Sequence, residues 1–227
     1  MLIMKRMLLL AACIAPVFAG AQTAPKIDSS YANWYYESRM DLYNQLNDQP
    51  ADILFLGNSI TERGEWHELL PGKKVANRGI GGDNTFGVLA RLDGVVQQKP
   101  KKLFLLIGIN DIGRGLPVEV ILHNYRRILT RLTQDLPETK IIVQSVLPMN
   151  EGKLPYAYLK NKADKIKAVN EGIVPLATEF NLTYLNLHEL FADEKGELKA
   201  AYTKDGIHLE PAAYVDWVKW LKKQKQL

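Results

Sequence analysis

The stretch Ile53-Leu54-Phe55-Leu56-Gly57-Asn58-Ser59-Ile60 joins a short apolar run to a turn that carries a serine. The run is rich in branched and aromatic residues, which is typical of a strand buried on both faces of a parallel sheet. Gly57 permits a tight turn, and the residues after it can open a helix whose N-terminus favours negative charge. Ser59 is therefore either the cap of that helix or a reactive group at the end of the strand.

A strand-helix rhythm continues through the rest of the chain. Further short apolar runs lie at 73–76, 103–107, 141–146 and 182–187. Helical patterns lie at 86–97, 117–136, 158–180 and 211–223, and an amphipathic stretch at 31–46 precedes the first strand. Prolines begin two of these helical patterns, as the first turn of a helix allows. The pattern predicts an α/β fold, a three-layer doubly wound sandwich with a parallel sheet of about five strands.

Polar or glycine residues follow three of the predicted strands at the point where each ends. Ser59 follows the first strand, Gly82 the second and Asn110 the third. Ligands of doubly wound sheets bind at the carboxyl ends of the strands. We therefore expect these three residues to meet at one edge of the sheet.

The sequence Asp205-Gly206-Ile207-His208 places a carboxylate three residues before an imidazole. A serine hydroxyl is a poor nucleophile unless an imidazole removes its proton, and that imidazole needs a carboxylate to fix its tautomer. Without Ser59, the same four residues would be interpreted as a turn followed by a surface histidine. Together with Ser59 they predict nucleophile, base and orienting group for acyl transfer.

Acyl transfer also needs donors for the oxygen that becomes negative in the tetrahedral intermediate. The glycine-rich stretch 77–84, Asn-Arg-Gly-Ile-Gly-Gly-Asp-Asn, can bring backbone N–H groups close to a ligand. The stretch Gly108-Ile109-Asn110-Asp111 offers a side-chain amide. The predicted oxyanion hole consists of the N–H groups of Ser59 and Gly82 and the amide of Asn110.

These blocks, in this order and spacing, resemble the SGNH or GDSL-type hydrolases, and the resemblance covers most of the chain after its first residues. It implies a flavodoxin-like fold, with Ser59 as nucleophile, Asp205 and His208 as orienting group and base, and Gly82 and Asn110 as oxyanion donors. The chain departs from the family's namesake motif at position 58, which is Asn instead of Asp. Because the triad carboxylate is Asp205, we expect Asn58 to leave the mechanism intact.

Within that family, stretch 77–85 together with Leu89-Ala90-Arg91-Leu92 is most similar to platelet-activating-factor acetylhydrolases and bacterial carbohydrate acetylesterases. The similarity implies a serine esterase that removes small acyl groups, acetyl above all, from a small-molecule or carbohydrate ester. Two alternatives stay open: a lipase or thioesterase acting on longer chains, and a catalytically silent carbohydrate-binding protein on the same scaffold. Arg63 and Trp66 are candidate substrate contacts, although surface and capping roles are the ordinary ones for such residues.

The first 21 residues have the three parts of a secretory signal peptide: a basic start, an apolar stretch and a small-residue end at Ala19-Gly20-Ala21. We expect residues 22–30 to form a linker and residues 31–227 to form the hydrolase domain. The protein would then be exported, to the periplasm or the medium, with no membrane span. Leu10-Ala11-Ala12-Cys13 also resembles a lipoprotein box, but the residues after Cys13 stay apolar, which disfavours a lipid anchor.

Composition excludes several other classes of protein. The 227 residues are 47% apolar and 24% charged, which suits one globular domain. Cys13 is the only cysteine, so a mature protein without the leader has no disulfide, thiolate nucleophile or cysteine-bound metal. The net charge is +4 with no basic stripe, which argues against nucleic acid as a partner. Nothing in the sequence requires a metal or a cofactor, and the oligomeric state is left open.

Overall fold

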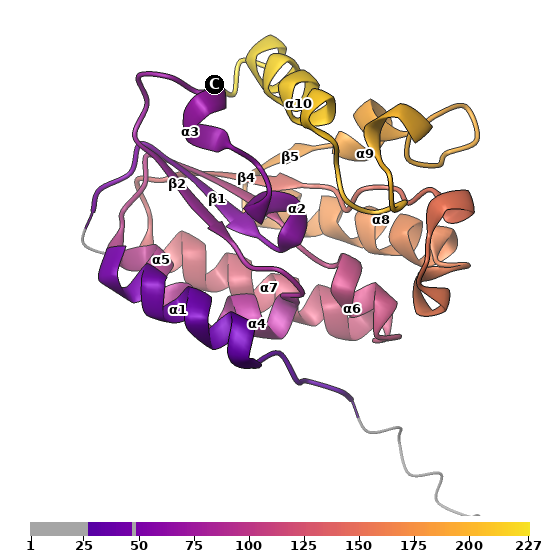
Figure 1. Ribbon diagram of the computed structural model, residues 1–227. Helices are drawn as coiled ribbons and strands as arrows, with labels where there is room; N and C mark the ends of the chain where they lie inside the picture. The colour runs from indigo at the N-terminus through magenta and orange to yellow at the C-terminus, as the bar shows by residue number, and fades with distance from the viewer. Residues whose placement is uncertain (1–26, 47–48) are drawn as a thin grey trace, which may run out of the picture.

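The computed structural model describes residues 27–46 and 49–227 (Figure 1). The expected signal peptide, the candidate lipid anchor at Cys13 and most of the expected linker lie outside these residues. The described part forms a five-stranded sheet with the order β2-β1-β3-β4-β5, in which every neighbouring pair is parallel. The predicted doubly wound α/β fold is confirmed.

Short strands carry the sheet, and helices fill the connections between them. The strands are β1 (Ile53–Gly57), β2 (Val75–Gly79), β3 (Lys102–Leu106), β4 (Lys140–Gln144) and β5 (Thr183–Leu185). The helices before β3 are α1 (Trp34–Leu46), α2 (Ser59–Glu62), α3 (Trp66–Leu69), α4 (Thr85–Ala90) and α5 (Leu92–Gln97). Those after it are α6 (Ile109–Gly113), α7 (Val118–Asp135), α8 (Ala163–Glu179), α9 (Leu187–Phe191) and α10 (Pro211–Lys223), with short 3₁₀ turns η1 (Glu151–Lys153), η2 (Ala157–Leu159) and η3 (Ala200–Tyr202).

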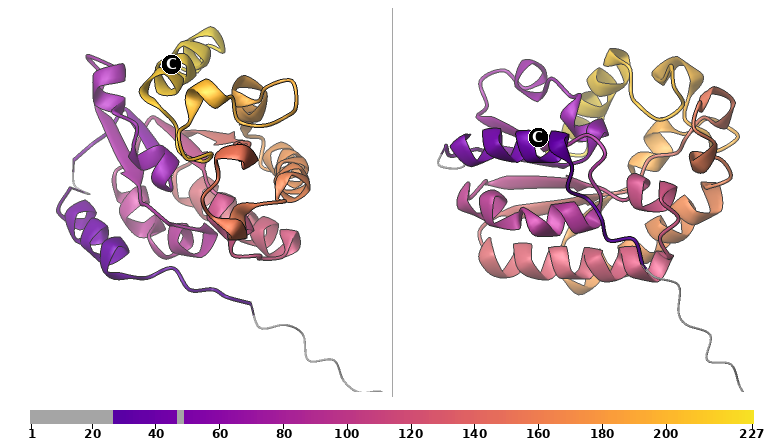
Figure 2. Two further views of the ribbon diagram at one scale, coloured as in Figure 1. Left: turned by 45° about the vertical axis from the view of Figure 1, so that its right-hand side comes forward. Right: turned by 60° about the horizontal axis from the view of Figure 1, so that its bottom comes forward.

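Helices cover both faces of the sheet and make the three layers (Figures 1 and 2). Helices α3 and α10 lie on one face, and α1, α4, α5 and α7 lie on the other. The first strand occupies the point where the winding changes direction, between β2 and β3. In the register, Gly57 pairs with Gly79 on one side and with Leu106 on the other, so the three strands end at the same level. The segments that follow them therefore share one edge.

Three of the predicted elements differ from the structure in ways that the fold explains. The second strand was expected at 73–76 but runs from Val75 to Gly79, because its polar Asn77 and Arg78 hid its second half from a hydrophobicity pattern. The helix expected over 86–97 is two helices, α4 and α5, that meet at Arg91. The helix expected from residue 158 begins at Ala163, after the separate turn η2.

One part of the hydrophobic core is an aromatic layer between the sheet and α10, and the core continues through buried residues of α7 and α8. Phe55 of β1 stacks on Trp66, with ring centroids 3.8 Å apart, and on Phe104 of β3 at 4.9 Å. Trp66 meets Trp217 of α10 edge to face at 5.1 Å. The Tyr214 hydroxyl, also on α10, donates to the carbonyl of Ile60 at 2.7 Å. These contacts fix α10 against the turn that carries the serine.

The helix α1 docks on the domain through a small apolar cluster of its own. Tyr36 and Tyr43 pack with Ile80, and all three are buried. The Tyr36 hydroxyl donates to the carbonyl of Gly87 at 2.8 Å, and the Tyr43 hydroxyl donates to that of Gly79 at 2.5 Å. The stretch at 31–46 therefore docks on the domain through a helix that begins at Trp34.

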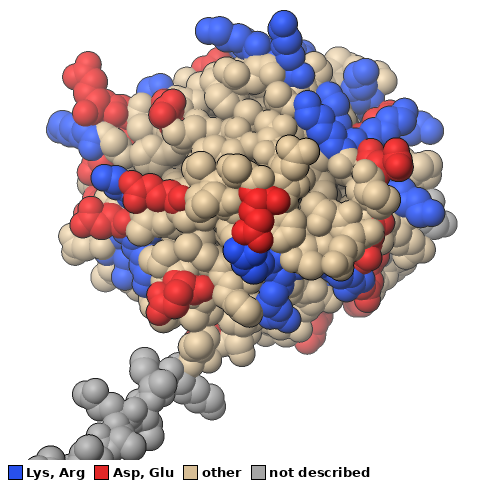
Figure 3. Space-filling view, turned by 180° about the vertical axis from the view of Figure 1, so that it is seen from behind, with Lys and Arg blue, Asp and Glu red and all other residues tan. Residues whose placement is uncertain are grey.

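The surface of the described residues mixes charges of both signs. On the face shown in Figure 3, basic and acidic side chains are interspersed and neither gathers into a long stripe. Across the described ranges, no helix has the length and apolar character needed to cross a bilayer.

Candidate active site

Ser59 is the first residue of α2, directly after the turn that ends β1. The N-cap is Asn58, whose side-chain oxygen accepts from the N–H of Ile60 at 3.0 Å. Asn58 thus makes the local hydrogen bond that an aspartate would make, and Ser59 is not needed as the cap. A side chain at Gly57 would bring a Cβ within 2.3 Å of both the Leu106 carbonyl and the Thr61 hydroxyl, so only glycine fits that turn.

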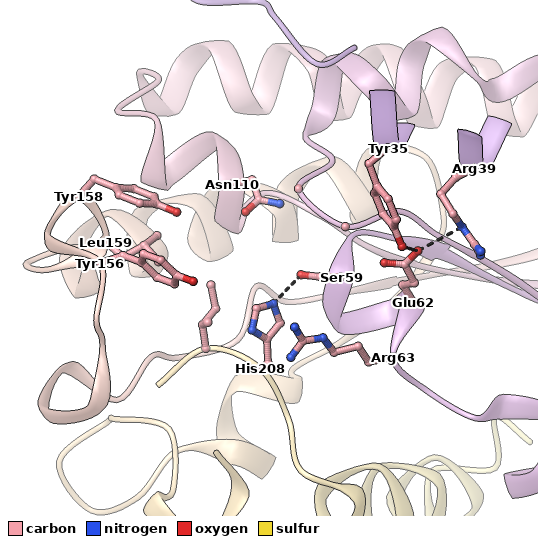
Figure 4. A pocket seen from close by; sticks show the side chains of 13 residues that line it. Tyr35, Arg39, Ser59, Glu62, Arg63, Asn110, Tyr156, Tyr158, Leu159 and His208 are labelled. Atoms are coloured by element: carbon pink, nitrogen blue, oxygen red, sulfur yellow. Dashed lines mark hydrogen bonds and ion pairs between the residues drawn. The ribbon is translucent and has the colours of Figure 1, made fainter. Parts of the chain in front are cut away.

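The predicted nucleophile, base and carboxylate lie together. His208 Nε2 is 2.9 Å from Ser59 Oγ, although the two residues are 149 positions apart in sequence (Figure 4). His208 Nδ1 is 2.6 Å from Asp205 Oδ2. Because a carboxylate can only accept from the ring, Nδ1 carries the proton and the lone pair of Nε2 faces the serine hydroxyl. This is the tautomer that a general base requires.

The Asp205 carboxylate is fixed by its own turn. Its second oxygen accepts from the backbone N–H groups of Ile207 at 3.1 Å and His208 at 2.8 Å. Burial opposes its ionisation, but these bonds and the one from the His208 ring lower the pKa of Asp205 to about 2. Gly206 has φ +80°, and a Cβ there would lie 2.5 Å from the Asn150 carbonyl oxygen, so the turn requires glycine.

The three expected oxyanion donors border the same cavity as the serine. The N–H of Ser59 belongs to the first residue of a helix and has no partner within that helix. Gly82 has φ +77°, a conformation that glycine adopts readily. The Asn110 amide donates one hydrogen to the Asp83 carbonyl at 2.7 Å, and its other hydrogen can serve a ligand. The three donors are placed as the sequence predicted, and their catalytic role stays a prediction.

A buried ion pair supports the glycine-rich loop from behind. Arg91 and Asp83 are 3% and 1% exposed, and Arg91 Nε donates to Asp83 Oδ2 at 2.9 Å. The same guanidinium donates to the carbonyls of Arg78 at 2.9 Å and Gly57 at 3.0 Å. Burial raises the pKa of Asp83, and the Arg91 charge opposes that rise. One arginine therefore links β1, β2 and the loop that presents Gly82.

A second buried carboxylate, Asp111, joins the loop to α6. Its Oδ1 accepts from the Thr85 hydroxyl at 2.5 Å, and both its oxygens lie 3.1 Å from the Thr85 N–H. The Asn124 amide donates to the same hydroxyl at 2.9 Å. Burial raises the pKa of Asp111 to about 6. The sequence stretches 77–84, 89–92 and 108–111 contain Asp83, Arg91 and Asp111, but the supporting contacts of these residues are visible only in the fold.

The cavity at this edge has a volume of about 620 Å³. Its walls come from α1, the β1–α2 turn, the glycine-rich loop, η2 and the turn before α10 (Figure 4). The lining residues are Tyr35, Arg39, Ser59, Glu62, Arg63, Gly81, Gly82, Asn110, Tyr156, Tyr158, Leu159, Ile207 and His208. The sequence reading did not assign Tyr35, Arg39 and Glu62 to the site. One feature of the sequence could have indicated them: Tyr35 and Arg39 are four residues apart on one helix and therefore lie on the same face of it.

The two candidate substrate contacts have different positions. Arg63 lines the cavity, as expected for a residue one turn after Ser59. The expectation for Trp66 was wrong, because its side chain is 1% exposed and lies in the core. Its indole N–H donates to the Thr61 carbonyl at 2.8 Å, which turns the ring inward. Among the described residues, no group of three or more histidine, cysteine or acidic side chains could hold a metal ion.

A serine, an imidazole and a carboxylate in hydrogen-bonded series, beside backbone and amide donors, are typical of serine hydrolases that act on acyl compounds. Residues 55–215 match the model of the GDSL-like Lipase/Acylhydrolase family. The chain belongs to this family of carboxylic ester hydrolases.

Relatives of known sequence or structure agree with that assignment. The chain is 28% identical to the platelet-activating factor acetylhydrolase IB subunit alpha2 of Gallus gallus over 173 residues, 74% of this chain and 72% of the relative. A structure from Streptococcus pneumonia, provisionally described as a platelet activating factor, superposes with a TM-score of 0.78 and 35% identity, over 84% of this chain and 92% of that one. An acetyl xylan esterase shares the fold, with a TM-score of 0.63 and 18% identity over 76% of this chain and 98% of its own.

Proposed function

We propose that this protein is an exported acetylesterase that removes acetyl groups from carbohydrate esters through a Ser59 acyl-enzyme. The observation that carries the proposal is the continuous hydrogen-bonded series from Ser59 through His208 to Asp205, at 2.9 and 2.6 Å, on the wall of an open cavity.

The geometry suits a two-step mechanism. His208 takes the proton of Ser59 as the hydroxyl attacks the ester carbonyl, and Asp205 supports the resulting imidazolium. The N–H groups of Ser59 and Gly82 and the Asn110 amide receive the negative oxygen. His208 then protonates the leaving alcohol, and water, activated by the same imidazole, releases the acid. Acidification stops the first step, because an imidazolium cannot accept the hydroxyl proton.

The lining of the cavity favours a small acyl group. Leu159 and Ile207 are its only aliphatic side chains among the described residues, and the rest of the lining is polar, aromatic or glycine. A long acyl chain needs an extended apolar wall to leave water, since each buried methylene contributes about 0.8 kcal/mol. The names of the relatives, an acetylhydrolase and an acetyl xylan esterase, support acetate as the acid.

Two tyrosines support a sugar as the alcohol part of the substrate. Tyr156 and Tyr158 line the cavity and are 45% and 58% exposed, with ring centroids 5.6 Å apart. Exposed aromatic rings with a polar tip present an apolar face and a hydrogen-bonding group together, which matches the two sides of a pyranose ring. The leader-like sequence of the first 21 residues supports export, where polysaccharide substrates are met.

The test is release of acetate from p-nitrophenyl acetate and from acetylated xylo-oligosaccharides, with a chelator present. We expect activity in the wild type, loss of labelling by a fluorophosphonate probe in Ser59→Ala, and loss of turnover in the same variant. Ser38→Ala, an exposed serine on α1, is the matched control and keeps both properties. Undiminished turnover in Ser59→Ala would exclude this nucleophile. A panel of esters from acetyl to long acyl chains tests the preference for short acids.

A further inference from the structure

Some of the charged side chains that line the cavity have an ion-pair or hydrogen-bond partner, and one has none among the described residues. Glu62 accepts a hydrogen bond from the Tyr35 hydroxyl at 2.7 Å and pairs with Arg39, whose Nε lies 3.1 Å from the same oxygen. The imidazole of His208 is engaged by Asp205. The side chain of Arg63 makes no hydrogen bond or ion pair with any group in ranges 27–46 and 49–227. Within those ranges the cavity therefore holds one uncompensated guanidinium.

The guanidinium of Arg63 lies on the same side of the cavity as Ser59 and His208. Arg63 follows Ser59 by four residues, which places the two on the same side of the α2 turn. Its backbone N–H donates to the Ser59 carbonyl at 3.0 Å, so the two residues are fixed relative to each other. In Figure 4 its side chain extends from α2 toward His208. A group attached close to the ester oxygen of a bound substrate would lie within reach of it.

The neighbouring acid does not cancel this charge. The Glu62 side chain is adjacent in sequence, but its carboxylate is turned to the α1 wall by Tyr35 and Arg39. The charges of Glu62 and Arg39 cancel each other, so Arg63 is the positive side chain that faces the open cavity without a counter-charge in the described part of the chain. A planar guanidinium fork matches a carboxylate with two parallel hydrogen bonds, which an alcohol or a neutral sugar ring cannot offer.

We propose that the alcohol part of the natural substrate is an acidic saccharide, an acetylated uronic acid, whose carboxylate binds Arg63. This rests on the proposed acetylesterase function and narrows its substrate class. The carboxylate must belong to the alcohol part, because an acetyl group carries no second charge. In this arrangement Tyr156 and Tyr158 contact the sugar ring from the opposite wall of the cavity, as Figure 4 shows for their positions relative to Arg63.

The experiment compares one sugar in two charge states. Acetylated oligogalacturonate and its methyl-esterified form differ only in the carboxylate, and released acetate is measured for both. We expect the wild type to have a kcat/KM about fivefold higher for the charged form, the size of one partly exposed charge-assisted contact. Salt at about 1 M should shrink the preference, because it screens exposed charges within about 3 Å.

Two variants assign the preference to one residue. Arg63→Gln keeps a hydrogen-bonding side chain without the charge, and we expect the ratio of the two kcat/KM values to fall to about one. Arg126→Gln, which removes an exposed arginine paired with Glu179 outside the cavity, is the matched control and keeps the wild-type ratio.

Equal rates on both forms in the wild type, or an unchanged ratio in Arg63→Gln, would overturn the proposal. A preference for the methyl-esterified form would overturn it as well. These outcomes differ from failure of the esterase function itself, in which neither form nor p-nitrophenyl acetate releases acetate in a Ser59-dependent way.

Discussion

The two halves of the active site are held by different kinds of contact. The acid-base half, from Asp205 to His208, is a single turn whose hydrogen bonds span two or three residues. The oxyanion half, the loop with Gly82, depends on contacts over longer distances in the chain, including Arg91 to Gly57 over 34 residues. The contacts within the Asp205–His208 turn do not depend on distant residues. The position of the oxyanion loop, by contrast, depends on its buried hydrogen-bond and ion-pair network. The two halves should therefore fail in different ways when mutated.

The largest effect is expected in the acid-base half. Asp205→Asn presents an amide to Nδ1 and favours the wrong imidazole tautomer, so we expect kcat to fall about 10⁴-fold. The fold should persist, because the remaining turn contacts are local. Steady-state kinetics and thermal unfolding check this together, with Asp216→Asn, an exposed carboxylate bonded to Tyr202, as the control. A loss of less than tenfold would mean that Asp205 does not orient the base.

The oxyanion half should fail through stability. Arg91→Met leaves the buried Asp83 carboxylate without its counter-charge, and we expect the free energy of unfolding to fall by about 3–5 kcal/mol. Urea denaturation measures this. Arg131→Met is the matched control, because Arg131 pairs with Asp93 at the surface, where such pairs contribute about 0.2–1 kcal/mol. Equal losses in the two variants would contradict the comparison.

Removing the side-chain donor should separate chemistry from stability within the oxyanion half. Asn110→Ala deletes the amide that is predicted to receive the developing charge, and we expect kcat to fall about 10²- to 10³-fold with little change in KM. Asn186→Ala, which removes an exposed amide bonded to Glu189, serves as the control. If KM rises and kcat stays constant, Asn110 binds the substrate in its ground state instead.

The smallest effect concerns the pH dependence of stability, where Asp205 and Asp111 have opposite signs. The pKa of Asp205 is lowered to about 2, so its contribution is present above the unfolded value of 3.8 and is lost as pH falls toward 2. The pKa of Asp111 is raised to about 6 by burial, so the folded protein binds its proton more tightly and loses stability as pH rises from 3.8 to 6. Asp111→Asn, which carries no charge, should flatten that slope in urea titrations between pH 4 and 6. An unchanged slope would show that Asp111 does not titrate there.

The same division explains what the sequence could predict. The strand and the serine turn of β1 follow from a continuous apolar run and a glycine, and the Asp205 to His208 turn is visible in four letters. Both are local patterns, and the structure places them as expected. The register of β2, by contrast, depends on Asn77, whose amide donates to the carbonyls of Glu62 and Gly64. A pattern of hydrophobic residues cannot predict these hydrogen bonds of a polar side chain.

The predictions that were wrong failed because of tertiary contacts between residues far apart in the sequence. The helix expected at 86–97 is divided at Arg91, where the guanidinium leaves the helix surface to reach Asp83 and two carbonyls. Trp66 was interpreted from its distance in sequence to Ser59, but Phe55 and Trp217 offer it aromatic contacts inside. The walls of the cavity come from α1 and η2, whose proximity to the serine is a property of the fold.

The attachment of α10 has a consequence for when this enzyme first becomes active. The base lies on the turn just before α10, and that helix is anchored to the serine turn by Tyr214 and to β4 by Trp217, which donates to Gln144. A chain that has folded only as far as β5 holds the nucleophile, Ser59, without the imidazole that activates it. Esterase activity should therefore appear only when the segment after β5, with His208, has packed against the serine turn.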